Sequence, residues 1–277
     1  MKIFLKGTPI LAAVMLLCSC STTPVTGRKQ MNLTSETEVA KMSIASFEQM
    51  KADMPISTDP EYNDMLQRVG FRISQQVFSA MPLAEWEFVV FDQQDVNAFA
   101  MPGGKVGVFE GLFKIVKTED ELASVVAHEI AHVTARHTHE RISQAMVLNG
   151  GGTLVNVATA VTGAGLLGVG SGSYINMSSV ITGLYGMKAG QSAAKWDQNK
   201  EAEADHIGII YMARAGYDPH AAITVMERMV ELDSGRGGGT YNSTHPSSVD
   251  RLNALHGYLF DAMEEYEKSK DFYFQEF

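Results

Sequence analysis

The feature that most constrains this chain of 277 residues is the pentapeptide His128-Glu129-Ile130-Ala131-His132. Its pattern, HExxH, is typical of zinc hydrolases. Residues four apart lie on one face of an α-helix, so His128 and His132 can both reach a single Zn²⁺. Glu129 lies between them, where it can take a proton from an attacking water molecule. The pentapeptide therefore predicts a helix that carries two zinc ligands and a general base.

The surrounding sequence favours a largely buried helix. Thr118 and Glu121 have the spacing of a capping box, which marks a helix start. Apolar residues then recur at helical intervals, at Leu122, Val125, Val126, Ile130 and Val133. A core helix with incidental histidines is the alternative, but imidazoles and a carboxylate are costly to bury without a partner. Further helices are expected over residues 36–50, 59–77, 201–215, 219–232 and 252–270.

A zinc site of this kind needs a third protein ligand. One class continues as HExxHxxGxxH, but here Ala135 and Thr138 occupy the glycine and third-histidine positions, and His137 is one residue out of register. A second class takes a glutamate from another helix, followed four residues later by an aspartate. Glu201 and Asp205 have this spacing. Glu201 is then the third ligand, and Asp205 holds a ligand histidine through its other ring N–H.

Glu203 lies between these two residues in sequence but points about 160° away from their face, given the turn per residue of a helix. We therefore expect it to be a solvent-exposed or structural carboxylate. The alternative for the whole segment is an acidic helix surface without a metal.

The chain resembles family 48 of the metallopeptidases, and within that family a branch of bacterial periplasmic lipoproteins. The resemblance runs from about Pro24 to about Leu259. It rests on the order of these segments, from first to last: Pro24–Arg28, Asn97–Gly104, the HExxH pentapeptide, Glu201–Gly208, Ala215–Pro219, and Thr244–Pro246 with Arg251. The resemblance implies an α+β, mainly helical, zincin-like domain, with a small sheet packed on the HExxH helix and one Zn²⁺ per chain.

The resemblance also implies a strand for substrate binding. Asn97, Ala98, Phe99 and Ala100 form an expected edge strand that would pair with an extended substrate backbone. Neighbouring strands are expected over residues 87–91 and 105–109, with a turn at Pro102–Gly104. An ordinary strand and turn would have the same local sequence.

His245 precedes a proline in a Gly/Ser/Thr-rich loop over residues 234–248. Two functional interpretations compete. His245 can stabilise the oxyanion of the tetrahedral intermediate, or it can be a fourth zinc ligand that inhibits the enzyme until the loop moves. The alternative is that His245 is a surface histidine with no role in the site. Arg251 can likewise stabilise the oxyanion or cap the last helix.

The N-terminal residues predict a bacterial lipoprotein. Lys2 and Lys6 precede a short apolar segment, and Leu17-Cys18-Ser19-Cys20 has the pattern of a lipoprotein cleavage site. We expect a signal peptide over residues 1–19, a lipid on Cys20, a tether over residues 20–31, and a metallopeptidase domain over residues 32–277. Ser21 follows the lipidated cysteine, which favours the outer membrane, with the domain facing the periplasm.

Composition narrows the choice of partners. The formal net charge is −10 and no basic cluster is visible, which argues against nucleic-acid binding. Both cysteines lie in the leader or at its end, so the mature domain has no disulfide. Residues 142–187 contain no charged residue. Helices that cover the cleft are the favoured interpretation of this segment. Contact with a membrane surface is the second interpretation, and a membrane span is the third. The oligomeric state is not predicted.

The sequence as a whole indicates a zinc-dependent endopeptidase of the cell envelope whose substrates are polypeptides. The resemblance suggests misfolded or stalled envelope proteins as those substrates. The alternative is a chaperone-like or scaffolding lipoprotein that keeps the zinc site and rarely cleaves.

Overall fold

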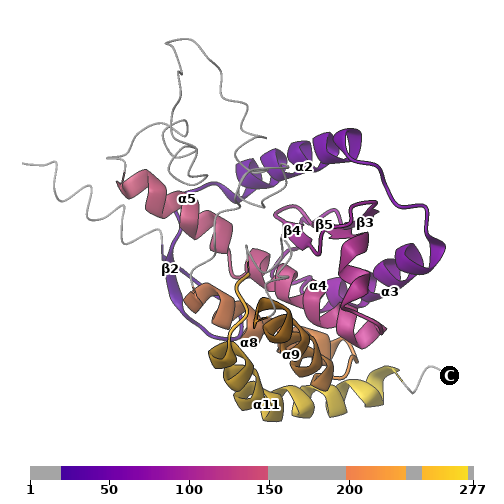
Figure 1. Ribbon diagram of the computed structural model, residues 1–277. Coiled ribbons are helices and arrows are strands. Elements are labelled where there is room, and N and C mark those ends of the chain that lie inside the picture. Colours follow the sequence, from indigo (N-terminus) through magenta and orange to yellow (C-terminus); the bar gives the residue numbers. More distant parts are fainter. Residues whose placement is uncertain (1–19, 149–197, 235–244, 274–277) are drawn as a thin grey trace, which may run out of the picture.

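The computed structural model describes residues 20–148, 198–234 and 245–273. It is mainly helical, with a three-stranded sheet near the centre and a two-stranded hairpin at the N-terminal side (Figure 1). The hairpin is formed by β1 (Cys20–Thr22) and β2 (Lys29–Met31), which pair antiparallel. The residues expected to be only a tether are therefore a folded element, which the sequence did not predict.

The central sheet has the strand order β3-β5-β4. It consists of β3 (Glu87–Phe91), β4 (Ala98–Met101) and β5 (Lys105–Phe109). β5 pairs parallel with β3 and antiparallel with β4, so β4 is an edge strand, as predicted. A short 3₁₀ helix, Glu110–Lys114, follows β5.

Helices cover both faces of this sheet. Val90, Ala100 and Val108 belong to a core shared with α3 (Pro60–Gln76) and α4 (Glu119–Thr134). Side chains of the opposite face pack against α2 (Glu36–Asp53): Val89, Phe91, Phe99, Met101 and Phe109. Burial on both faces explains why these strands are apolar almost throughout rather than alternating. The predicted contact of the sheet with the HExxH helix is confirmed, and the cover by α2 is additional.

The predicted helix starts are confirmed by their caps. Ser35, Asp59 and Thr118 accept hydrogen bonds from the first-turn amides of α2, α3 and α4. Glu121 differs in detail from a capping box, because its carboxylate accepts from the backbone N–H of Lys117 rather than from that of Thr118.

The second half of the domain is helical. It comprises α5 (His137–Leu148), α8 (Gln198–Arg214), α9 (His220–Ser234) and α11 (Val249–Tyr273). α8 lies between α4 and α11, and α9 packs on α4 and α11 (Figure 1). Gly216, at φ 76°, ends α8 as predicted: its N–H bonds to Ala213 O, and that of Tyr217 bonds to Met212 O.

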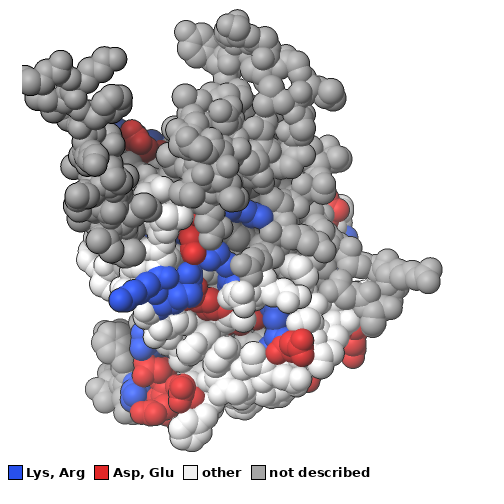
Figure 2. Space-filling view, turned by 90° about the vertical axis from the view of Figure 1, so that its left-hand side faces the viewer, with Lys and Arg blue, Asp and Glu red and all other residues white. Residues whose placement is uncertain are grey.

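Charged side chains of both signs lie intermixed on the face drawn in Figure 2. Within the described ranges, no helix is both long and apolar enough to cross a membrane. Most of the uncharged stretch from residue 142 to 187 lies outside the described residues, as does most of the loop before His245.

Helices α4 and α8 approach each other closely at Gly208. A Cβ atom there would lie 3.0 Å from both the N and the Cα atom of His128. Because the contact is with helix backbone, a larger residue must push the two helices apart.

We predict that Gly208→Ala lowers the free energy of unfolding by about 1–3 kcal/mol, because the added methyl overpacks this crossing. Gly257→Ala is the matched control, since a Cβ at this exposed position of α11 meets nothing within 4 Å. The control should gain about 0.5–1 kcal/mol from helix propensity. Chemical denaturation of both variants tests this, and equal gains in both would show that the crossing is not tight.

Candidate metal centre

Helix α4 places the HExxH side chains in the interior. His128, Glu129 and His132 are all less than 7% exposed. The Nε2 atoms of His128 and His132 are 3.1 Å apart, as expected for residues four apart on one helix face. The two imidazoles therefore converge on one point, as the motif predicts.

Helix α8 brings a carboxylate to the same point. Glu201 is fully buried, with Oε1 3.3 Å from His132 Nε2 and Oε2 3.5 Å from His128 Nε2. The predicted third member of the set is thus in place beside both imidazoles.

His245, from the segment before α11, completes the cluster. It is 4% exposed, and its Nδ1 lies 3.2 Å from Glu201 Oε1 and 3.4 Å from His128 Nε2. Its Nε2 lies 3.7 Å from Glu129 Oε1. One nitrogen or oxygen atom from each of His128, His132, Glu201 and His245 lies within 4.8 Å of the others. The interpretation of His245 as a surface histidine is therefore wrong.

Asp205 orients His128 as predicted. Its Oδ1 lies 3.0 Å from His128 Nδ1. Arg251 in turn holds Asp205 through two hydrogen bonds, Nε to Oδ2 at 2.8 Å and Nη2 to Oδ1 at 2.7 Å. Burial raises the pKa of Asp205, but Arg251 and His128 outweigh this and lower it, so the carboxylate is ionised.

The guanidinium of Arg251 also joins Glu201 to the segment that carries His245. Besides Asp205, its Nη1 reaches Glu201 Oε2 at 2.9 Å and the carbonyl of Pro246 at 2.8 Å. Its contacts fix Asp205 and Glu201 of α8 against the segment that carries His245.

A second orienting relay was missed by the sequence analysis. His137 Nδ1 lies 2.9 Å from His132 Nδ1, and His137 Nε2 lies 3.0 Å from Glu203 Oε2. His137 reaches this position because the chain turns sharply at Arg136, whose φ of 54° is left-handed. Glu203, 8% exposed, is therefore a structural rather than a solvent-exposed carboxylate.

The chemistry of the donor set fits a metal ion. Asp205, as a carboxylate, can only accept, so neutral His128 donates its Nδ1–H and presents an unprotonated Nε2 with a lone pair for a metal ion. The relay through His137 leaves His132 Nε2 in the same state. Two imidazole lone pairs 3.1 Å apart cannot bond to each other and need a cation between them. Nitrogen and carboxylate ligands of this kind are those that Zn²⁺ prefers.

The local charge agrees with this fit. Three carboxylates, those of Glu129, Glu201 and Asp205, face one guanidinium, that of Arg251, which leaves two negative charges for a divalent cation to balance. Burial lowers the pKa of His128, but Asp205 and Glu201 outweigh burial and raise it to about 10, so that a metal ion binding at Nε2 would displace a proton. Burial lowers the pKa of His132 well below its usual value; Glu201 opposes this effect, and the neighbouring imidazoles of His128 and His137 add to it.

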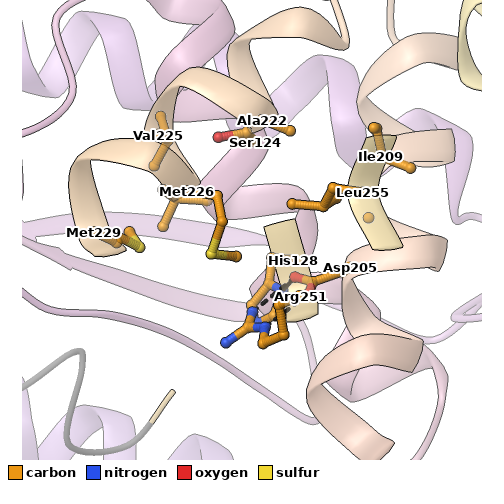
Figure 3. A pocket seen from close by; sticks show the side chains of 12 residues that line it. Ser124, His128, Asp205, Ile209, Ala222, Val225, Met226, Met229, Arg251 and Leu255 are labelled. Atoms are coloured by element: carbon orange, nitrogen blue, oxygen red, sulfur yellow. Dashed lines mark hydrogen bonds and ion pairs between the residues drawn. The ribbon is translucent and has the colours of Figure 1, made fainter. Parts of the chain in front are cut away.

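A cavity of about 40 Å³ lies beside the centre, among α4, α8, α9 and α11 (Figure 3). Val225, Met226 and Met229 of α9 form an apolar wall. At the other end lie the hydrogen-bonded side chains of His128, Asp205 and Arg251, which Figure 3 shows close together.

Comparisons with known proteins agree with this geometry. The model of peptidase family M48 matches residues 60–259, which include every member of the cluster. The mitochondrial metalloendopeptidase OMA1 of Schizosaccharomyces pombe is 30% identical over 89% of this chain and 68% of its own length.

Two further relatives match shorter fractions of their own length. OMA1 of Saccharomyces cerevisiae is 35% identical over 67% of this chain. The β-barrel assembly-enhancing protease of Escherichia coli K12 is 29% identical over 84% of this chain. The chain spans about half the length of these two relatives, 50% and 46%. With its buried His/His/Glu/His cluster and this family match, the chain belongs to peptidase family M48 and carries a metallopeptidase domain.

Proposed function

We propose that the protein is a zinc-dependent endopeptidase of the bacterial cell envelope that acts on misfolded or stalled envelope proteins. The convergence of two imidazole nitrogens and a buried carboxylate, with Glu129 beside them, carries the proposal. The name of the E. coli relative, which refers to β-barrel assembly, supports a location in the cell envelope. The lipoprotein pattern that ends at Cys20 supports the same compartment, with the membrane contacted through an N-terminal lipid.

His128, His132 and Glu201 would hold the zinc ion. Bound there, Zn²⁺ supplies a Lewis acid that activates a water molecule and polarises the carbonyl of the scissile peptide. Asp205 and Arg251 keep His128 and Glu201 in place, so little reorganisation is needed when substrate arrives.

Glu129 is the general base. It follows His128 on α4, is 3% exposed, and shares the interior of the site with His245. Its carboxylate takes a proton as the water attacks the peptide carbonyl, and then gives a proton to the departing amine nitrogen. Both transfers use one side chain that alternates between base and acid.

The substrate backbone would align along β4. This edge strand packs against α4, the helix that carries the HExxH residues. Just before it, Asn97 is 2% exposed, and its Nδ2 has no hydrogen-bond partner within the described part of the chain. A buried amide donor of this kind is suited to a substrate carbonyl. The cavity beside His128 offers room for a small apolar side chain.

His245 would act as a fourth ligand that closes the resting site. Its place among the other three side chains supports this role more directly than that of an oxyanion stabiliser. Four protein ligands leave no open position for the attacking water. Activity would then require the segment before Pro246 to move.

We predict that Glu129→Gln lowers kcat for casein cleavage by about 10²–10⁴-fold, because the amide cannot take the proton. Zinc content, measured by elemental analysis, should stay near that of the wild type, since Glu129 is not a ligand. Glu267→Gln, at an exposed position of α11, is the control and should cleave normally. A Glu129→Gln variant with full activity would refute the proposed mechanism.

We predict that His245→Ala cleaves casein faster than the wild type, because loss of the fourth ligand opens a coordination position. Initial rates with one zinc per chain test this on protein without residues 1–19. His220→Ala is the matched control, since His220 is exposed and pairs with Asp218 away from the cluster. A slower His245→Ala enzyme with unchanged zinc content would instead make His245 an oxyanion stabiliser.

The presence of His245 in the cluster also supports a second candidate function. A protein whose site is filled at rest can act as a chaperone-like or scaffolding lipoprotein that rarely cleaves. Replacing the gene by the Glu129→Gln form separates the two: a normal envelope phenotype supports the scaffold, and a null phenotype supports the protease.

A further inference from the structure

The turn of the N-terminal hairpin contacts a buried carboxylate of α8. Glu203 Oε1 accepts hydrogen bonds from the hydroxyl groups of Thr23, at 2.8 Å, and Thr26, at 2.5 Å. Glu203 Oε2 accepts from Arg28 Nε at 2.8 Å and lies 3.0 Å from His137 Nε2. The acceptor capacity of this carboxylate is thus filled, and the hairpin supplies most of the donors.

The turn adopts an unusual backbone conformation to make these contacts. Val25 has φ 60°, a left-handed conformation that a β-branched residue rarely adopts, and Gly27 has φ 65°. Such a residue costs on the order of 1–3 kcal/mol and persists only where its surroundings impose it. Here it lies between Thr23 and Thr26, whose side chains both point to Glu203.

Arg28 extends the contact to a second helix. Its guanidinium bonds to Glu140 of α5 at 2.9 Å, while Lys200 of α8 pairs with the same carboxylate at 2.5 Å. A guanidinium is always charged, and Arg28 pairs with both Glu203 and Glu140. Both carboxylates are therefore ionised, and Glu203 can only accept hydrogen bonds.

The direction of the hydrogen bonds then follows. Because Glu203 only accepts, His137 donates its Nε2–H to it. His137 Nδ1 is left to accept the Nδ1–H of His132 across 2.9 Å. The Nε2 of His132 therefore carries no proton and faces the cluster, which is the only tautomer of neutral His132 that can bind a metal there.

We propose that His137 and Glu203 are positioning residues for His132, and that the hairpin turn Thr23–Arg28 contributes to metal binding. The turn does so by holding His137 and Glu203 in the arrangement that gives His132 its metal-binding tautomer. The proposal rests on the proposed function only in taking His132 as a metal ligand. It assigns a role in metal binding to the N-terminal hairpin, far from the HExxH helix in sequence.

Zinc affinity, measured by competition with a chelating dye, tests the proposal on the chain without residues 1–19. Glu203→Gln and His137→Leu should each weaken zinc binding about 10–100-fold, as loss of a residue that orients a metal ligand does. His137→Gln should retain most of the affinity, since its amide oxygen accepts from His132 and its amide N–H donates to Glu203. A purely space-filling role for His137 predicts no such difference between leucine and glutamine.

The hairpin is tested by Thr26→Val, which keeps the shape of the side chain and removes one donor to Glu203. We expect a loss of about threefold in zinc affinity. Thr224→Val, in α9, removes an exposed hydroxyl that bonds only to its own helix, and serves as the matched control without effect. These variants also decide the question if His137→Leu fails to fold.

Long-range ¹⁵N–¹H correlation spectra of the zinc-bound protein report the tautomer directly. We expect a proton on Nδ1 of His132 and on Nε2 of His137. Unchanged zinc affinity in Glu203→Gln and Thr26→Val, or a proton on Nδ1 of His137, would overturn the proposal. A His245→Ala variant that binds zinc but cleaves nothing would count against the proposed peptidase function alone, because the affinity comparison does not use cleavage.

Discussion

The metal centre depends on the close crossing of α4 and α8. Gly208 lets the backbone of α8 approach that of α4 at His128. Glu201 and Asp205 lie seven and three residues before this glycine, so the same helix face brings both carboxylates to the imidazoles. Buried carboxylates need compensating charges, and Arg251 of α11 provides one. The position of α11, and of the segment that carries His245, therefore follows from how α8 meets α4.

The two imidazoles of the HExxH motif are oriented by different parts of the chain. His128 donates directly to Asp205, which the C-terminal helix holds through Arg251. His132 is oriented through one more imidazole, and the carboxylate at the end of that relay is held by the N-terminal hairpin. Segments that precede and follow the HExxH helix in the sequence thus orient His132 and His128, respectively. The arrangement leaves each ligand nitrogen with one protonation state compatible with binding.

Much of the site was predictable because it depends on local periodicity. The spacing of His128 and His132, and that of Glu201 and Asp205, places each pair on one helix face whatever the tertiary structure. The caps at Ser35, Asp59 and Thr118 are local as well. The edge position of β4 came from the family resemblance, and the order β3-β5-β4 confirms it.

The rest depended on tertiary contacts that no local pattern encodes. The HExxHxxGxxH pattern does not identify His137 as part of the site. Here Arg136, rather than a glycine, makes the left-handed turn that brings His137 against His132. Glu203 does point away from Glu201, as helix geometry requires, but what lies on that side is the hairpin rather than solvent. The landmark Pro24–Arg28 was a signal that this segment has a structural partner.

The hydrogen bond between Thr23 and Glu203 joins residues 180 positions apart, and His128 and His245 are 117 apart. Contacts this distant form late, after most of the chain has been made and has collapsed. A nascent or partly unfolded copy therefore lacks groups that complete the centre. Metal loading becomes a checkpoint on folding, because a copy of this metallopeptidase that has not finished folding has no complete centre with which to cleave other polypeptides.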